Sequence, residues 1–246
     1  IRDEEMDEIE GYLERGGNLY ISGPVGNERL QKLLGIRITG RTEHGFTYMS
    51  PTEEGKGILK GFDRLTPLTV PMAQTKADIT DGEGITVLAT RTLPYTLTDT
   101  EDFAAIHSNP PGVYTEEPCL ILKDTGKNKI IWSAAPIEMS KPYMSRQVFF
   151  RIIQALIRKP VFTSNAPKFV EILSWEKDGK DYLAAVNEQE ESPIAPMYDI
   201  YIDVKDQGKQ AYLLPSRAEI KTELIGKDTM RIYLPKLEVF QMIELT

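Results

Sequence analysis

Cysteine and histidine are scarce in this chain of 246 residues. It contains one cysteine, Cys119, and two histidines, His44 and His107. A single cysteine excludes an internal disulfide, but it assigns no compartment, because many exported proteins also lack disulfides. No group of histidine, cysteine and carboxylate residues has metal-site spacing, so we expect no metal and no cofactor.

Long apolar runs and an excess of basic charge are also absent. No run approaches the roughly 20 apolar residues that a membrane-spanning helix needs. The formal net charge is −8, which disfavours nucleic acid as a partner because phosphate binding needs a basic surface. We therefore expect neither a membrane nor a nucleic acid partner. The composition, 41% hydrophobic and 27% charged, is that of a globular protein with a packed core.

Helical and strand patterns alternate through residues 1–160. Helices are predicted at residues 4–15, 27–34 and 142–158, the second with Asn27 as its N-cap and Gly35 as its stop. Strands are predicted at residues 18–22, 36–39, 66–70, 85–90, 119–123 and 129–134. Several of these runs lack strict alternation, which is typical of strands covered on both faces. The pattern predicts an α/β domain with a flavodoxin-like, doubly wound, mainly parallel sheet.

The pattern changes after residue 160. Residues 161–168 are rich in proline and serine and are predicted to be a linker. Residues 169–246 contain no helical pattern and about seven short strand runs separated by turn signals. This spacing predicts a second domain, a small antiparallel β-sandwich.

No residue is predicted to be catalytic. Nucleophilic catalysis by cysteine needs the thiol at an exposed turn beside a base. Cys119 instead opens an apolar strand run, which indicates a buried structural thiol. Trp132 and Trp175 lie inside strand patterns, so we expect both in the core rather than on an exposed sugar-binding surface.

Five polar residues are weak candidates for binding a ligand. His107 and Asn109 lie in a rigid Pro-Pro-Gly turn, where they could face a ligand at a sheet edge or hydrogen-bond the turn itself. Arg91 and Tyr95 follow a predicted strand and could line the same crevice or be ordinary surface residues. Glu138 follows the last predicted strand of the first domain, with no histidine or cysteine nearby in the sequence for it to orient.

The first domain resembles the class I glutamine-amidotransferase-like superfamily. More narrowly, it resembles β-galactosidase-trimerisation domains and the ThuA-like (trehalose-utilisation) group. The resemblance is carried by residues 3–23, 33–36, 107–112 and 129–136. It places the amidotransferase nucleophile in the turn at residues 22–26, which holds no cysteine, and its histidine at Ala134 or Ala135. The resemblance thus implies that the amidotransferase chemistry is missing.

Residues 169–246 resemble the β-sandwich that follows such domains in large glycoside-hydrolase-like proteins. The matching segments are residues 182–187, 196–200 and 234–243. In that family an upstream (β/α)8 barrel holds the catalytic carboxylates. The resemblance also implies a strand before residue 1, so we expect the chain to belong to a longer protein.

Two functions follow from these observations. The first is a non-catalytic accessory or oligomerisation region of a carbohydrate-processing protein, whose partners would be an upstream barrel domain, further copies of the chain or a carbohydrate. The alternative is a free-standing ThuA-like enzyme or sugar-binding protein that uses a crevice near His107. A native reading frame with several hundred upstream residues would favour the first function.

Overall fold

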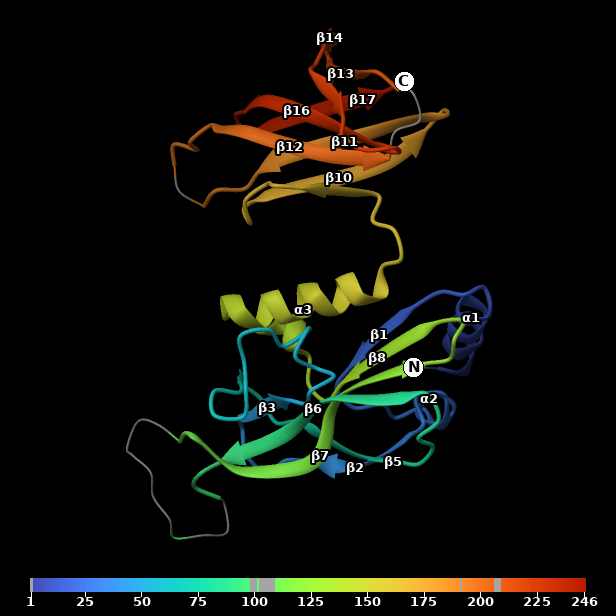
Figure 1. Ribbon diagram of the computed structural model, residues 1–246, viewed down its shortest axis with the longest axis vertical. Helices are drawn as coiled ribbons and strands as arrows, with labels where there is room; N and C mark the ends of the chain where they lie inside the picture. The colour runs from blue at the N-terminus through green and yellow to red at the C-terminus, as the bar shows by residue number, and fades with distance from the viewer. Residues whose placement is uncertain (1, 98–100, 102–108, 191, 206–208) are drawn as a thin grey trace. The chain divides into compact units, whose positions relative to one another are not determined.

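The computed structural model describes residues 2–97, 101, 109–190, 192–205 and 209–246. The chain divides into two compact units, residues 1–158 and 159–246, each with its own hydrophobic core (Figure 1). Within the described residues, no helix has the length and apolar character needed to span a bilayer.

The first unit is built on a six-stranded sheet. In spatial order its strands are β1 (Leu19–Ser22), β8 (Lys129–Ser133), β7 (Pro111–Asp124), β6 (Ile85–Pro94), β3 (Thr47–Pro51) and β4 (Leu68–Val70). The β1–β8 pair is parallel, whereas β8–β7, β7–β6, β6–β3 and β3–β4 are antiparallel. Strands β2 (Ile36–Arg41) and β5 (Thr75–Ile79) form a separate antiparallel pair.

The helices lie close to their predicted positions. They are α1 (Asp3–Glu14), α2 (Glu28–Leu34) and α3 (Tyr143–Leu156), with a short 3-10 helix, η1 (Ile137–Met139), between β8 and α3. The predicted cap of α2 is confirmed, because the side chain of Asn27 accepts a hydrogen bond from the backbone N–H of Leu30 at 3.2 Å. The predicted stop is confirmed as well, since Gly35 adopts the left-handed conformation with φ of 70°.

The predicted doubly wound, mainly parallel, flavodoxin-like sheet is wrong. Among the described residues the unit has three α-helices, and β1 with β8 is its one parallel pair. Instead of a crossover helix, the chain between residues 36 and 133 supplies antiparallel strands, with β6 and β7 as a long hairpin. The prediction treated each apolar run as a parallel strand, but such runs show only that both faces are covered.

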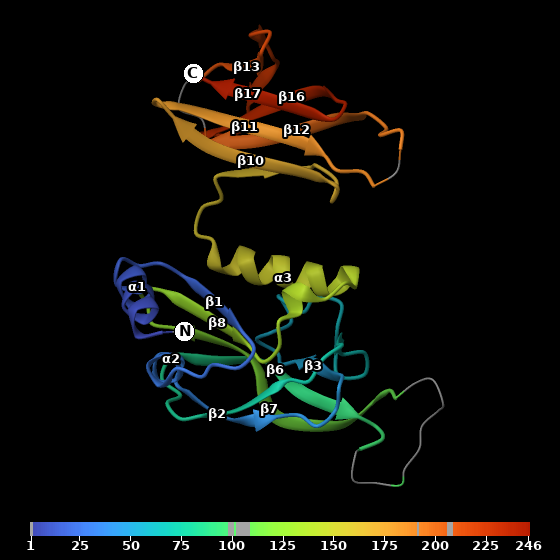
Figure 2. The ribbon, with the colours of Figure 1, turned by 180° about the vertical axis from the view of Figure 1, so that it is seen from behind.

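Burial in β8 explains why the sequence pattern misled. Ile130, Ile131 and Trp132 are consecutive, and none is more than 1% exposed. Successive strand residues point to opposite faces, so both faces of β8 are covered. Helix α3 packs against β1 and β8 (Figure 2), and β5 lies beside β7 (Figure 1). Strand β8, which is parallel to β1 and antiparallel to β7, therefore has the same hydrophobic run as a strand of an all-parallel sheet.

The second unit consists of two antiparallel sheets around a common core. One contains, in order, β10 (Val170–Lys177), β11 (Lys180–Asn187), β17 (Phe240–Leu245), β13 (Ala211–Leu214) and β14 (Ala218–Glu219). The other contains β15 (Thr222–Leu224), β16 (Thr229–Leu237), β12 (Met197–Lys205) and β9 (Phe162–Ser164). Strand β9 lies in the segment that we expected to be a linker, and it pairs with β12.

Candidate functional site

Three polar side chains meet where the parallel strands β1 and β8 end. The hydroxyl of Tyr20 donates a hydrogen bond to Glu138 Oε2 at 2.8 Å, and that of Ser22 donates to Glu138 Oε1 at 2.6 Å. Tyr20 and Ser22 are two residues apart in β1, so they lie on the same face of the strand. Glu138 comes from η1, the helical turn after β8. The two hydroxyls therefore hold this carboxylate at the carboxyl edge of the parallel pair.

The environment of this cluster keeps Tyr20 neutral. Burial, together with the hydrogen bond to the Glu138 carboxylate, raises the pKa of Tyr20 well above its ordinary value of 10.0. Its ring packs edge-on against Phe149 of α3, with ring centroids 5.3 Å apart. The cluster thus connects β1, η1 and α3, and it serves as a hydrogen-bonded anchor within the unit.

The turn after β1 is fixed by the backbone and by Trp132. The Gly23 N–H donates to Ser133 O at 2.8 Å, and the Trp132 indole N–H donates to Gly23 O at 3.0 Å. Gly23 itself has φ of 75°. Residues 22–26 supply one hydroxyl, that of Ser22, which is already bonded to Glu138.

Cys119 lies in the interior of the sheet. It is fully buried, and its thiol donates to Ala89 O at 3.4 Å. Burial raises the pKa of Cys119 to about 12. At neutral pH the group is therefore a thiol and not the thiolate that nucleophilic chemistry requires.

Arg91 is buried rather than lining an open crevice. Its side chain is 0% exposed, it forms an ion pair with Glu117, and its Nη2 donates to Thr75 O at 2.7 Å. Arg91 thereby joins β6 to β7 and to β5. These contacts account for two of its three nitrogens.

Tyr95 and Asn109 are brought together at the far end of the β6–β7 hairpin. The side-chain oxygen of Asn109 accepts from the Thr96 N–H at 2.8 Å, and its amide nitrogen donates to Thr96 O at 3.0 Å. Tyr95 is 51% exposed, and its N–H donates to Pro110 O at 2.7 Å. The amide of Asn109 thus bonds the hairpin's own backbone, while the Tyr95 ring is accessible. His107 lies outside the described residues.

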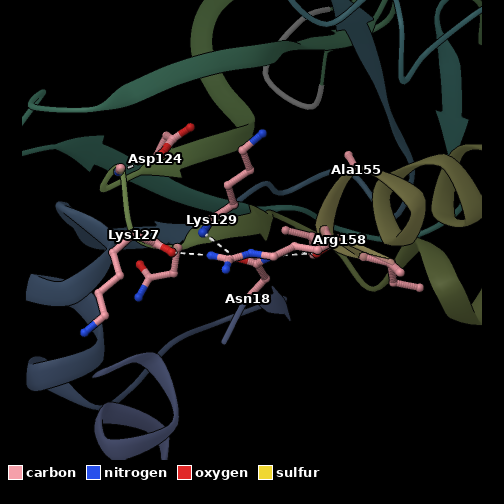
Figure 3. Close-up of a pocket in the computed structure, with 10 residues that line it drawn as sticks. Asn18, Asp124, Lys127, Lys129, Ala155 and Arg158 are labelled. Atoms are coloured by element: carbon pink, nitrogen blue, oxygen red, sulfur yellow. Dashed lines mark hydrogen bonds between the residues drawn. The ribbon is translucent and has the colours of Figure 1, made fainter. Parts of the chain in front are cut away.

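A cavity lies at the opposite edge of the parallel strands. It has a volume of about 370 Å³ and lies among the starts of β1 and β8 and the end of α3 (Figure 3). Asn18 donates to Leu156 O at 2.5 Å and accepts from the Lys129 N–H at 2.7 Å, while Arg158 donates to Lys127 O. These bonds join the end of α3 to the sheet. Their partners are mostly backbone groups, which indicates a structural role.

The sequence analysis missed the partners of Glu138 and misjudged the exposure of Trp175. Tyr20 and Ser22 alternate in a strand that leads into a glycine turn, and this polar spacing at positions i and i+2 was the available signal. Trp175 is 38% exposed, so the expectation that it is a core residue was wrong, whereas Trp132 is 0% exposed as expected.

In the part of the chain that the structure describes, no three histidine, cysteine or carboxylate side chains are grouped to hold a metal ion.

Comparison with known proteins yields structural relatives alone. No protein-family model matches the sequence, and no curated protein matches it. Solved structures of an alpha-L-fucosidase and of beta-galactosidases are among those that resemble the chain. Their sequence identities of 13–16% limit the likeness to the fold.

Three of these structures illustrate the match. Alpha-L-fucosidase isoenzyme 2 from Paenibacillus thiaminolyticus has 16% identity and a TM-score of 0.76, and the match covers 100% of this chain and 39% of that one. Gan42B, a GH42 beta-galactosidase from G. stearothermophilus, has 14% identity and a TM-score of 0.59. The beta-galactosidase from Rahnella sp. R3 has 13% identity and a TM-score of 0.56. In both galactosidases the match covers 99% of this chain and 30% of theirs.

Proposed function

We propose that this chain is a non-catalytic accessory region of a carbohydrate-processing protein. The observation that supports the proposal most strongly is the extent of the structural match. Essentially the whole chain, both units included, corresponds to a part of a glycoside hydrolase, and that part makes up 39% of the fucosidase and 30% of the galactosidases. The remaining 61–70% of those chains has no counterpart here.

The proposed roles are subunit association and the shaping of a catalytic domain's cleft. Residues 1–160 would act as a trimerisation-type domain, and residues 169–246 as the β-sandwich that accompanies it. The partners would be a barrel domain of the same protein and further copies of the chain. Such roles need surfaces rather than reactive groups.

The state of the chemically capable residues supports a non-catalytic role. Hydrolysis of a glycosidic bond needs two carboxyl groups about 5 to 9 Å apart around the scissile bond, one of them protonated. Glu138 uses both oxygens to anchor η1 to β1. Cys119 is buried with a raised pKa. These groups serve the fold.

The test is to assay the purified chain for hydrolysis of p-nitrophenyl α-L-fucoside and β-D-galactoside, and to measure its molar mass by light scattering after size exclusion. We expect no turnover above the protein-free rate and a molar mass of at least twice the 27.8 kDa of one chain. The Glu138→Gln variant and a control at an exposed carboxylate, Glu116→Gln, should behave like the parent chain in the assay.

Turnover that Glu138→Gln abolishes and Glu116→Gln leaves intact would contradict the proposal and favour the free-standing enzyme. A monomeric chain without turnover would contradict subunit association and leave cleft shaping as the accessory role.

A further inference from the structure

The outward face of the β10–β11–β17–β13–β14 sheet carries an unusual row of side chains. The strand pairing aligns Trp175, Tyr182, Glu244, Tyr212 and Glu219 across five neighbouring strands. Their sequence neighbours Leu183, Ile243 and Ala211 belong to the core, so the row points away from it. Four strand spacings make the row about 19 Å long.

The aromatic end of the row is exposed and rigid. Trp175 is 38% exposed and lies on β10, at the edge of the sheet. Its ring stacks on that of Tyr182, with centroids 5.6 Å apart and planes 13° from parallel. The Tyr182 hydroxyl donates to Glu244 Oε2 at 3.3 Å, which fixes the second ring in turn. A ligand that stacks on Trp175 would therefore meet a surface that is already ordered.

The centre of the row presents charged groups that neutralise one another. Lys180 lies 3.3 Å and Arg217 2.8 Å from the Glu244 carboxylate, and the Arg217 guanidinium also lies over the Tyr212 ring at 5.3 Å. The two cations are 40% and 54% exposed, whereas the carboxylate is 6% exposed. Arg217 adopts φ of 57°, a conformation that is uncommon outside glycine and that orients it in the β13–β14 turn. The row thus offers exposed hydrogen-bond donors beside an aromatic face.

We propose that this row, together with the flanking Lys180 and Arg217, binds a neutral oligosaccharide. A pyranose ring has an apolar face of C–H groups that stacks on an exposed indole. Its hydroxyls accept hydrogen bonds from cationic side chains and donate hydrogen bonds to carboxylates. The exposed indole of Trp175 can stack on the apolar face of such a ring, and the paired charges around Glu244 can hydrogen-bond its hydroxyls. The length of the row accommodates several sugar units. This inference goes beyond the proposed accessory function and concerns a surface of the second unit alone.

A neutral polyol fits the row better than a protein or an anion does. A protein surface would have to cover Lys180, Arg217 and Glu244 and desolvate them, which costs free energy. An anion would be attracted to the two cations but repelled by Glu244 and by the exposed Glu219 at the end of the row. A neutral ligand can instead leave the ion pairs in place and exchange only water for hydroxyl groups.

The test uses the full chain and two probes, β-1,4-galactotetraose and cellotetraose, in isothermal titration calorimetry. We expect at least one probe to bind, and Trp175→Ala to weaken that binding by about tenfold or more. Trp175→Phe, which retains an aromatic ring, should restore part of the affinity. The matched control is Phe240→Ala, because Phe240 is a 54% exposed aromatic residue on the same face but about 13 Å along β17 from Glu244.

Each alternative result identifies a different error. If neither tetrasaccharide binds, or if Trp175→Ala binds as tightly as the parent chain, the oligosaccharide site is wrong. Equal losses in Trp175→Ala and Phe240→Ala would also overturn it. A change of molar mass in Trp175→Ala without a change in sugar affinity would make the row a contact between protein chains. Glycoside hydrolysis by the chain would contradict the accessory function without bearing on this binding test.

Discussion

At the scale of single residues, Glu138 and Arg91 show how polar side chains hold the first unit together. Glu138 accepts hydrogen bonds from Tyr20 and Ser22, and Arg91 forms an ion pair with Glu117. Among the aromatic side chains discussed above, Trp175 and Tyr95 are exposed.

Cys119 provides a direct check at this scale. Its thiol is fully buried and its pKa is raised to about 12, so both access and ionisation oppose modification. We expect the native chain not to react with Ellman's reagent within an hour at pH 8, and the chain in guanidinium to react with one thiol per molecule. A Ser174→Cys variant, whose new thiol is exposed, should show one fast and one masked thiol. Rapid labelling of the parent chain would contradict this burial.

At the scale of elements, the end of α2 shows how one backbone conformation closes a helix. Gly35 has φ of 70°, and a Cβ at this position would lie 2.5 Å from Asp81 O. Gly35→Ala should therefore lower the free energy of unfolding by about 1 to 3 kcal/mol. Urea unfolding measures the loss when both glycine variants are compared in a Trp175→Phe background, where Trp132, in the same unit as Gly35, is the one remaining tryptophan.

The control for this substitution is Gly26→Ala. Gly26 lies in the turn before the same helix, but a Cβ there would contact nothing within 4 Å. The free energy of unfolding of the Gly26→Ala variant should stay within about 0.5 kcal/mol of that of the parent chain. Similar losses in both variants would show that the strain at Gly35 is not the cause.

Elements with strong local signals were predictable from the sequence, whereas their pairing was not. The cap at Asn27, the stop at Gly35 and the spacing of apolar residues placed the three helices within two residues. The long hairpin β6–β7 was underestimated, because Pro111 and Pro118 in β7 read as breaks. The direction of strand pairing depends on long-range contacts that no local pattern encodes.

The candidate sites were predictable to a smaller extent. Polarity identified Glu138, but its partners Tyr20 and Ser22 lie more than 100 residues away in the sequence. The row on the second unit likewise depends on register, since Trp175, Glu244 and Tyr212 come from three separate strands. Strand pairing creates both arrangements, so composition alone gave no indication of them.

At the scale of the whole molecule, each unit has the core that an independent domain requires. The second unit buries residues from both of its sheets, among them Ile202, Ile232 and Ile243 at 0% exposure. We therefore expect residues 159–246, expressed alone, to fold and to unfold cooperatively. Near-UV circular dichroism and a urea titration measure this.

A matched variant separates a folded unit from residual structure. Ile232→Ala removes a fully buried side chain and should lower the stability of the isolated unit by about 2 to 5 kcal/mol. Absence of a cooperative transition in the parent fragment would mean that the second core is insufficient by itself.

The stacked pair on β10 and β11 also has an optical consequence. Tyr182 lies 5.6 Å from Trp175 with nearly parallel rings, a distance at which excitation of the tyrosine passes to the indole. The other indole, Trp132, is sealed in the first unit and contributes a constant background. A change in emission on adding a quencher or a ligand should therefore come mainly from Trp175, so this face of the second unit has an intrinsic fluorescent reporter.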